Sequence, residues 1–183
     1  MIPRMTDLPD LPTTQVARRF STGALSPADY AEALVERVCR DEPRVRALVH
    51  RDDEALRRAA RDARPGPLHG LPVGVKDVLD TAEMPTGAGS PIWKGHRPRA
   101  DAACVAMVRR AGGLVAGKTV TTEFATTFPG PTTNPHNAAH TPGGSSQGSA
   151  AGVAAGFFPL AFGTQTAGSI IRPAAFCGVV GYK

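Results

Sequence analysis

The sequence predicts an α/β fold in which a mixed, mostly buried β-sheet is flanked by helices. In the first third of the 183-residue chain, apolar residues recur at helical spacing. From residue 70 onward, short apolar runs typical of buried strands alternate with helical patterns, and glycine-rich turns separate them. Apolar residues make up 42% of the chain, which is enough to fill the core of one domain.

The segment from 1 to 65 is predicted to be helical. A short amphipathic pattern covers 13–20. Ser26 then supplies an N-cap, with a proline at the first helical position and an acid three residues after the cap, and apolar residues spaced by four predict a helix over 27–40. A further helix is predicted over 52–63, where a Pro-Gly-Pro run ends it.

Composition changes at this Pro-Gly-Pro run, and 66–183 is predicted to form the core that carries the chemistry. A short apolar run over 70–75 predicts a strand. A helix is predicted to open at Asp101 and to stop at Gly112, because glycine is favoured just past a helix end. The apolar residues 114–116 are typical of a buried strand.

The last third alternates in the same way. Residues 121–125 are predicted to begin a helix, whereas 129–142 is too rich in Pro, Asn and Gly for regular structure. Small residues predict a helix over 150–157, and the apolar run after it predicts a strand over 159–163. A second glycine turn is expected at 166–169.

The cysteines and the absence of long apolar runs bear on location. Cys39, Cys104 and Cys177 are an odd number at wide spacing without a CxxC pattern. This spacing supports neither a disulfide framework nor a zinc knuckle, so we expect no metal at the cysteines and a reducing, cytoplasmic location. No leader-like apolar segment marks the N-terminus, and no run of about 18 apolar residues occurs. We therefore expect neither secretion nor membrane insertion.

The net charge of +5 is spread along the chain instead of being gathered in one patch. Most arginines lie among acids at helical spacing, which is typical of a solvated helix face, so we expect no direct nucleic-acid partner. No Asp or Glu follows Glu123, and no His follows His140. Catalysis centred in the last third must therefore work without a local carboxylate or imidazole.

Two motifs match known patterns without their structural context. Residues 112–119 satisfy the P-loop pattern, but a helix precedes them and Leu-Val-Ala stands where the phosphate loop would be, so Lys118 is interpreted as structural or site-lining. Residues 144–148 satisfy the GxSxG pattern of a nucleophile elbow, which needs an acid and a histidine later in the chain. Neither follows within this sequence.

A lysine is the remaining candidate for a base. Lys76 follows the predicted strand directly, where apolar neighbours can lower the pKa of an amine by desolvation. A neutral lysine can take a proton from a serine hydroxyl, so serine–lysine chemistry is workable. The alternative is that Lys76 and Asp77 form a charge pair on the surface.

Three glycine-rich blocks occur in order, at 66–77, 143–149 and 163–178, and together they resemble the amidase signature family. The resemblance extends over nearly the whole chain. It implies the amidase-signature fold, here truncated, because family members are usually more than twice this long. The 66–183 core is then incomplete at its C-terminal end, and its exposed edges carry an association hazard.

The resemblance implies hydrolysis of a small carboxamide by a Ser-cisSer-Lys triad through an acyl-enzyme, without a cofactor. Ser169 matches the nucleophile, Ser145 matches the bridging serine that follows a cis peptide bond, and Lys76 matches the base. The resemblance also implies an oxyanion hole of backbone amides, those of Thr166, Ala167, Gly168 and Ser169.

Three further side chains are assigned from the resemblance with an alternative beside each. Ser146 and Thr164 match hydrogen-bond donors around the triad, or they cap helices and turns. Arg172 stands three residues beyond the nucleophile, where in some family members an arginine holds a substrate carboxylate by a bidentate contact, or it is structural. Gln165 and Ala167 depart from the commoner family pattern.

Three functions stay open on the sequence. The leading hypothesis is an amidase, or the N-terminal part of one, that acts on a small-molecule amide. The second is the glutaminase subunit of a tRNA-dependent amidotransferase, which delivers ammonia to a partner subunit that it needs. The third is a truncated, catalytically silent fragment. A homodimer and a separate partner subunit both stay open as assemblies.

Overall fold

A computed structural model describes residues 5–183, so the expectation about an N-terminal leader lies in part outside the described residues, at 1–4. The α-helices are α1 (Thr13–Ser21), α2 (Pro27–Val45), α3 (Asp53–Arg61), α4 (Ala103–Arg110), α5 (Gln147–Ala154) and α6 (Ile171–Cys177). The strands are β1 (Leu48–His50), β2 (Pro72–Lys76), β3 (Leu114–Thr119) and β4 (Leu160–Phe162). Short 3-10 turns lie at η1 (Met5–Asp10), η2 (Pro91–Trp93) and η3 (Glu123–Ala125).

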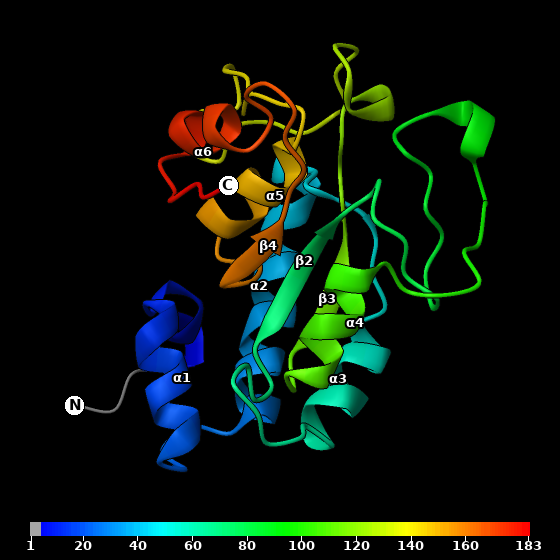
Figure 1. The fold of residues 1–183 in the computed structure, drawn as a ribbon. Helices are drawn as coiled ribbons and strands as arrows, with labels where there is room; N and C mark the ends of the chain where they lie inside the picture. The colour runs from blue at the N-terminus through cyan, green and yellow to red at the C-terminus, as the bar shows by residue number, and fades with distance from the viewer. Residues whose placement is uncertain (1–4) are drawn as a thin grey trace.

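The strands form one mixed sheet in the order β1-β3-β2-β4. Strand β2 pairs in parallel with both β3 and β4, whereas β1 pairs antiparallel with β3. The two central strands are buried along their whole length, and the edge strands are partly exposed. The predicted α/β class, with a mixed and mostly buried sheet between helices, is confirmed. In Figure 1 the carboxyl end of β2 points toward the end of the molecule where α5 and α6 lie.

The helices of the N-terminal segment begin where the sequence predicts. Ser26 caps α2, because its hydroxyl oxygen accepts a hydrogen bond from the backbone N–H of Asp29 at 3.0 Å. Asp52 caps α3 in the same way, accepting from Ala55 at 2.8 Å. Helix α2 extends past the predicted residue 40 and ends at Arg46, which adopts the left-handed conformation that closes many helices.

Both faces of the sheet are covered. Val75 and Val115 pack with Val105 of α4 on one face. On the other face Ala116 packs with Ala150 and further side chains of α5 and α2. Because successive side chains of a strand point to opposite faces, Lys76 turns away from the face that Val75 occupies. Lys76 therefore points toward the layer that contains α5.

One strand and one α-helix were not predicted, and one predicted helix was wrong. Strand β1 and helix α6 are short, so neither has enough residues to show a period in the sequence. Residues 121–125 form only the turn η3, because Phe124 and Ala125 both have positive φ angles, which a right-handed helix cannot contain. Helix α5 also begins at Gln147, three residues before the predicted start.

The lack of a side chain at Gly148 allows α5 to pack closely against the sheet. A Cβ atom at Gly148 would collide with the backbone oxygen of Ala47 and the backbone nitrogen of Val120. The N–H of Gly148 donates to the carbonyl of Val120 at 2.9 Å, so the first turn of α5 rests directly on the chain that leaves β3. The residues just before α5 are thereby held close to the carboxyl ends of the central strands.

The residues that resemble a P-loop form no phosphate loop. Within 112–119 a turn leads directly into β3, and all six residues of that strand are buried. Its amides therefore serve the sheet, which excludes the nucleotide interpretation. No helix in residues 5–183 has both the length and the apolar character needed to cross a membrane.

Candidate active site

Lys76 is the last residue of β2, and its side chain is fully buried, with 0% exposed. The amine Nζ lies 2.7 Å from the hydroxyl of Ser145 and 2.8 Å from the hydroxyl of Thr164. A third contact, at 3.5 Å, joins the amine to the Thr164 carbonyl. The structure thus brings a strand end and two distant loops together around one nitrogen, and the alternative of a surface charge pair is wrong.

Burial lowers the pKa of Lys76 from its ordinary value of 10.5 to about 8. The physical cause is desolvation, which disfavours the charged ammonium form. A lysine with this pKa is partly neutral near pH 8 and can accept a proton from a hydroxyl to which it is hydrogen-bonded. Lys76 therefore has both the contact and the acidity that a base requires.

The neighbouring carboxylate belongs to a different contact. Asp77 Oδ1 lies 3.2 Å from Nζ of Lys118, and both side chains are buried. Lys118 also donates to the hydroxyl of Thr86 at 2.7 Å and to the carbonyl of Pro85 at 3.1 Å. Because Asp77 is matched with Lys118, its charge is compensated away from Lys76. This assigns Lys118 the structural role that was one of its two interpretations.

Hydrogen bonds hold the backbone on both sides of Ser145. The bond between Gly144 and Ser145 is cis. The carbonyl of Gly144 accepts a hydrogen bond from Nε of Arg172 at 2.9 Å, and the carbonyl of Ser145 accepts one from the N–H of Thr122 at 3.2 Å. A side chain from α6 and a backbone N–H from the segment after β3 therefore hold the backbone on both sides of Ser145.

Ser146 ties this loop to the loop that follows β4. Its hydroxyl accepts from the N–H of Thr164 at 3.2 Å and lies 3.3 Å from the Thr164 carbonyl, to which it donates. Its own N–H donates to the carbonyl of Ser169 at 3.1 Å. Ser146 and Thr164 therefore lie where hydrogen-bonding residues around the base were expected, although Thr164 contacts the lysine itself.

Ser169 lies in the loop between β4 and α6 and is partly buried. Its carbonyl is bonded to Ser146, the residue next to Ser145. Among residues 5–183, however, no hydrogen bond joins the hydroxyls of Ser145 and Ser169. The structure brings together Lys76, Ser145 and Thr164, and it leaves the third member of the expected triad adjacent but unbonded.

A turn of unbonded amides precedes α6. Four successive backbone N–H groups donate no hydrogen bond within the described part of the chain. They belong to Thr166, Ala167, Gly168 and Ser169. The side-chain oxygen of Gln165 accepts instead from the N–H groups of Ile170 and Ile171. The sequence alone gives no local signal for which amides the Gln165 side chain contacts. There, Gln165 is noticeable only as a departure from the commoner family pattern.

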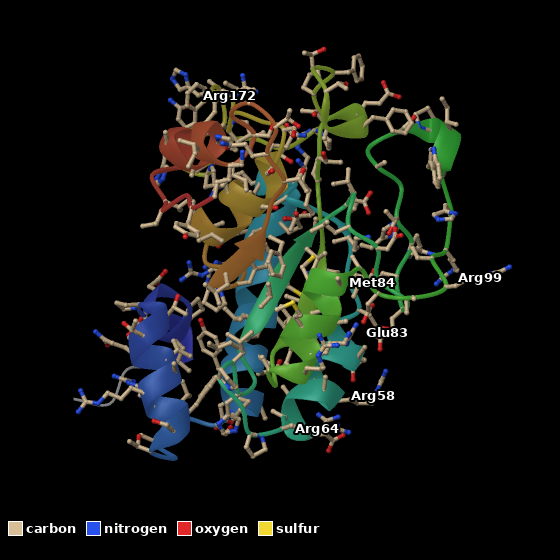
Figure 2. All side chains as sticks on the ribbon, in the orientation of Figure 1. Arg58, Arg64, Glu83, Met84, Arg99 and Arg172 are labelled. Atoms are coloured by element: carbon tan, nitrogen blue, oxygen red, sulfur yellow. The ribbon has the colours of Figure 1, made fainter. Side chains whose placement is uncertain are left out.

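Arg172 lies on the first turn of α6, at the outer side of this region (Figure 2), and its side chain is exposed. Its Nε is occupied by the Gly144 carbonyl, whereas its terminal nitrogens donate no hydrogen bond to residues 5–183. The residue thus has a structural contact through Nε and two terminal nitrogens that are free within the described residues. In the same described part of the chain, no group of three or more His, Cys, Asp or Glu side chains gathers as a metal site.

The mixed α/β sheet places a buried lysine on a serine hydroxyl, beside a turn of free amides, and these are the groups that acyl transfer with a lysine base requires. Comparison with known proteins identifies the family to which the chain belongs. The family model described as Amidase matches residues 29–183. This chain belongs to that family, the amidase signature family, and its fold is the amidase-signature fold.

Named relatives agree with the family. A glutamyl-tRNA(Gln) amidotransferase subunit of Salinispora arenicola is 44% identical over 194 residues, covering 98% of this chain and 39% of that protein. The native peptide amidase of Stenotrophomonas maltophilia is 37% identical, with a TM-score of 0.83 over 92% of this chain and 39% of the other. A 6-aminohexanoate cyclic dimer hydrolase is 35% identical, with a TM-score of 0.87 over 94% and 37%. The chain therefore spans about two fifths of the length of these proteins.

The pKa of Lys76 predicts a pH dependence of stability. Between pH 8 and 10.5 the unfolded chain still binds the lysine proton that the folded chain has lost, so the free energy of unfolding rises with pH. Over this pH range, loss of the Lys76 proton raises the free energy of unfolding by about 3 kcal/mol. This rise should be missing from a Lys76→Met variant, and urea titrations of both proteins from pH 7 to 11 measure the difference. Equal pH slopes in the two proteins would contradict the lowered pKa.

Proposed function

We propose that this chain carries the catalytic centre of an amidase that hydrolyses a small carboxamide through an acyl-enzyme. The observation that carries the proposal is the 2.7 Å hydrogen bond between the buried amine of Lys76 and the hydroxyl of Ser145. A buried amine of lowered pKa on a serine hydroxyl is costly to maintain for structure alone, whereas it is what a proton relay needs. The triad roles of Lys76, Ser145 and Ser169 are part of this proposal.

In the first half of the proposed reaction, neutral Lys76 takes the proton of the Ser145 hydroxyl, and Ser145 takes the proton of Ser169. The Ser169 oxygen then forms a bond to the amide carbonyl carbon, and the carbonyl electron pair moves onto its oxygen. The free N–H groups at 166–169 donate to this oxyanion. In other enzymes, removing one such donor costs about 3 to 4 kcal/mol.

In the second half, the proton returns from Lys76 through Ser145 to the amide nitrogen, and the carbon–nitrogen bond breaks to release the amine. Water then attacks the acyl group on Ser169 by the same relay, releasing the acid and restoring the serine. The step needs the hydroxyls of Ser145 and Ser169 to meet. Catalytic hydrogen bonds are often longer before substrate binds, and the Ser146 contact already holds the Ser169 backbone next to this point.

The proposal extends to the organisation and setting of the protein. We assign the site to 66–183 and a supporting role to the helical segment 1–65, whose strand β1 pairs with β3. A reducing, cytoplasmic location fits three cysteines that are all free.

Labelling with a fluorophosphonate probe tests the relay. The intact chain should form one adduct, which peptide mapping places on Ser169. Lys76→Ala and Ser145→Ala should slow adduct formation by a factor of about 100 or more, since each removes one step of proton transfer. Ser146→Ala is the matched control, because Ser146 does not contact the lysine, and its rate should fall less. Full labelling of Lys76→Ala, or a loss confined to Ser146→Ala, would overturn the assignment.

A second candidate function rests on the names of the relatives. Several proteins that match nearly the whole chain are named as one subunit of a glutamyl-tRNA(Gln) amidotransferase, at 39–44% identity. We propose as the alternative that this chain hydrolyses glutamine and passes ammonia to a partner subunit. Its site would use the same serine and lysine groups.

Substrate and partner dependence separate them. Hydrolysis of a small carboxamide by the chain alone supports the amidase. Glutamine hydrolysis that occurs only after partner subunits of such an amidotransferase are added supports the alternative. A chain that does neither, forms no fluorophosphonate adduct and has a weak near-UV circular dichroism spectrum is a catalytically silent fragment, which is the third hypothesis. Ammonia release and adduct mass are the measurements.

For Arg172 we propose contact with a substrate carboxylate. Its terminal nitrogens are free within the described residues, and a guanidinium binds a carboxylate in bidentate geometry. Arg172→Leu should reduce kcat/KM for an amide that carries a carboxylate by about 10-fold or more relative to a neutral amide of similar size. The ratio is the measurement, because loss of the Gly144 contact lowers both rates. An unchanged ratio would leave Arg172 with its structural role alone.

A further inference from the structure

We infer that Gln165 is a positioning residue that shapes the turn of free amides at 166–169. The inference rests on the proposed function, because the turn has a catalytic use only if an oxyanion forms beside it. Within residues 5–183 the Gln165 side chain is hydrogen-bonded to the N–H groups of Ile170 and Ile171, and it has no hydrogen bond with Lys76 or with the hydroxyls of the proposed relay. Its effect must therefore pass through the backbone that it holds.

The contact is a double one. The side-chain oxygen Oε1 accepts from the N–H of Ile170 at 2.8 Å and from the N–H of Ile171 at 2.9 Å. These two amides stand at the start of α6, where a helix leaves its first N–H groups without partners inside the helix. A single oxygen therefore satisfies two such donors.

The bonded groups enclose the turn. Gln165 precedes the four free amides and Ile170 follows them, so its side chain closes a ring around 166–169. Two carbonyls of the turn are also bonded, that of Gly168 to the N–H of Arg172 at 2.8 Å and that of Ser169 to the N–H of Ser146 at 3.1 Å. With these acceptors engaged and both ends tied, the turn keeps its N–H groups unbonded, as an oxyanion site requires.

The chemistry of glutamine suits this place. An amide oxygen accepts two hydrogen bonds without carrying a charge. Gln165 also does not titrate, so it adds no pH dependence to the turn. Capping of α6 alone is the competing role, and it predicts an effect on stability without an effect on the reaction.

Amide hydrogen exchange tests the contact without relying on activity. In the intact chain, Ile170 and Ile171 should exchange slowly and residues 166–169 quickly. Gln165→Met keeps the side-chain length but removes the acceptor, and it should speed exchange at both isoleucines by about 10-fold or more. Gln165→Glu keeps an oxygen acceptor and should retain the protection. Gln15→Met, on the exposed face of α1, is the matched control and should change nothing here.

Kinetics on the same variants test the positioning role. Gln165→Met should lower kcat for a small carboxamide by about 10- to 100-fold, with KM changed less than threefold. The rising limb of the pH profile should keep its midpoint near 8, because the Lys76 contacts are untouched. A kcat within twofold of the unchanged protein, or retained exchange protection in Gln165→Met, overturns the inference. A shifted midpoint also overturns it, because the effect would then act on the base.

Failure of the proposed function gives a different result. If the unchanged protein neither hydrolyses carboxamides nor forms a fluorophosphonate adduct, the proposed function fails, and with it the catalytic part of this inference. The exchange data then still decide whether Gln165 holds the turn. If hydrolysis and labelling are normal but Gln165→Met behaves like Gln15→Met, only the inference about Gln165 is wrong.

Discussion

The hydrogen bond between the buried amine of Lys76 and the Ser145 hydroxyl is the contact on which the rest of the site depends. An amine at that depth has lost its water, so its remaining contacts must come from the protein. Thr164 supplies one of them, which brings the loop after β4 to the end of β2. The close contact of Gly148 with the backbone brings the loop before α5 to the same point. Three separate segments are thus held around one nitrogen.

The sheet places two buried lysines beside different partners. Lys76 and Lys118 lie on neighbouring parallel strands, and both are fully buried. Desolvation lowers the pKa of both amines. At Lys118 the carboxylate of Asp77, 3.2 Å away, opposes that shift, whereas the contacts of Lys76 are hydroxyl and carbonyl groups and include no carboxylate. Since Asp77 follows Lys76 directly in sequence, only the alternation of the strand separates the carboxylate from the amine.

The loop from Thr164 to Arg172 acts as one hydrogen-bonded unit. It contacts the lysine at its first residue, ties to Ser146 through the carbonyl of Ser169, and reaches back through Arg172 to the carbonyl of Gly144. The two later glycine-rich blocks of the sequence are therefore joined at several points, although α5 and β4 lie between them. In the proposed reaction this unit would hold both the attacking oxygen and the donors for the oxyanion.

By itself the sequence determined the α/β class, the capped starts of α2 and α3, the central strands and the family, because these are carried by local periods, caps and contiguous glycine blocks. It also singled out Lys76 and Ser145. Tertiary structure alone decided that Asp77 pairs with Lys118, that 121–125 turns without becoming a helix, and that Gln165 bonds the start of α6. Each of these depends on where the backbone places groups that no local pattern connects. The same holds for β1 and α6, which are too short to show a period and exist because the sheet and α5 give them a surface to pack on.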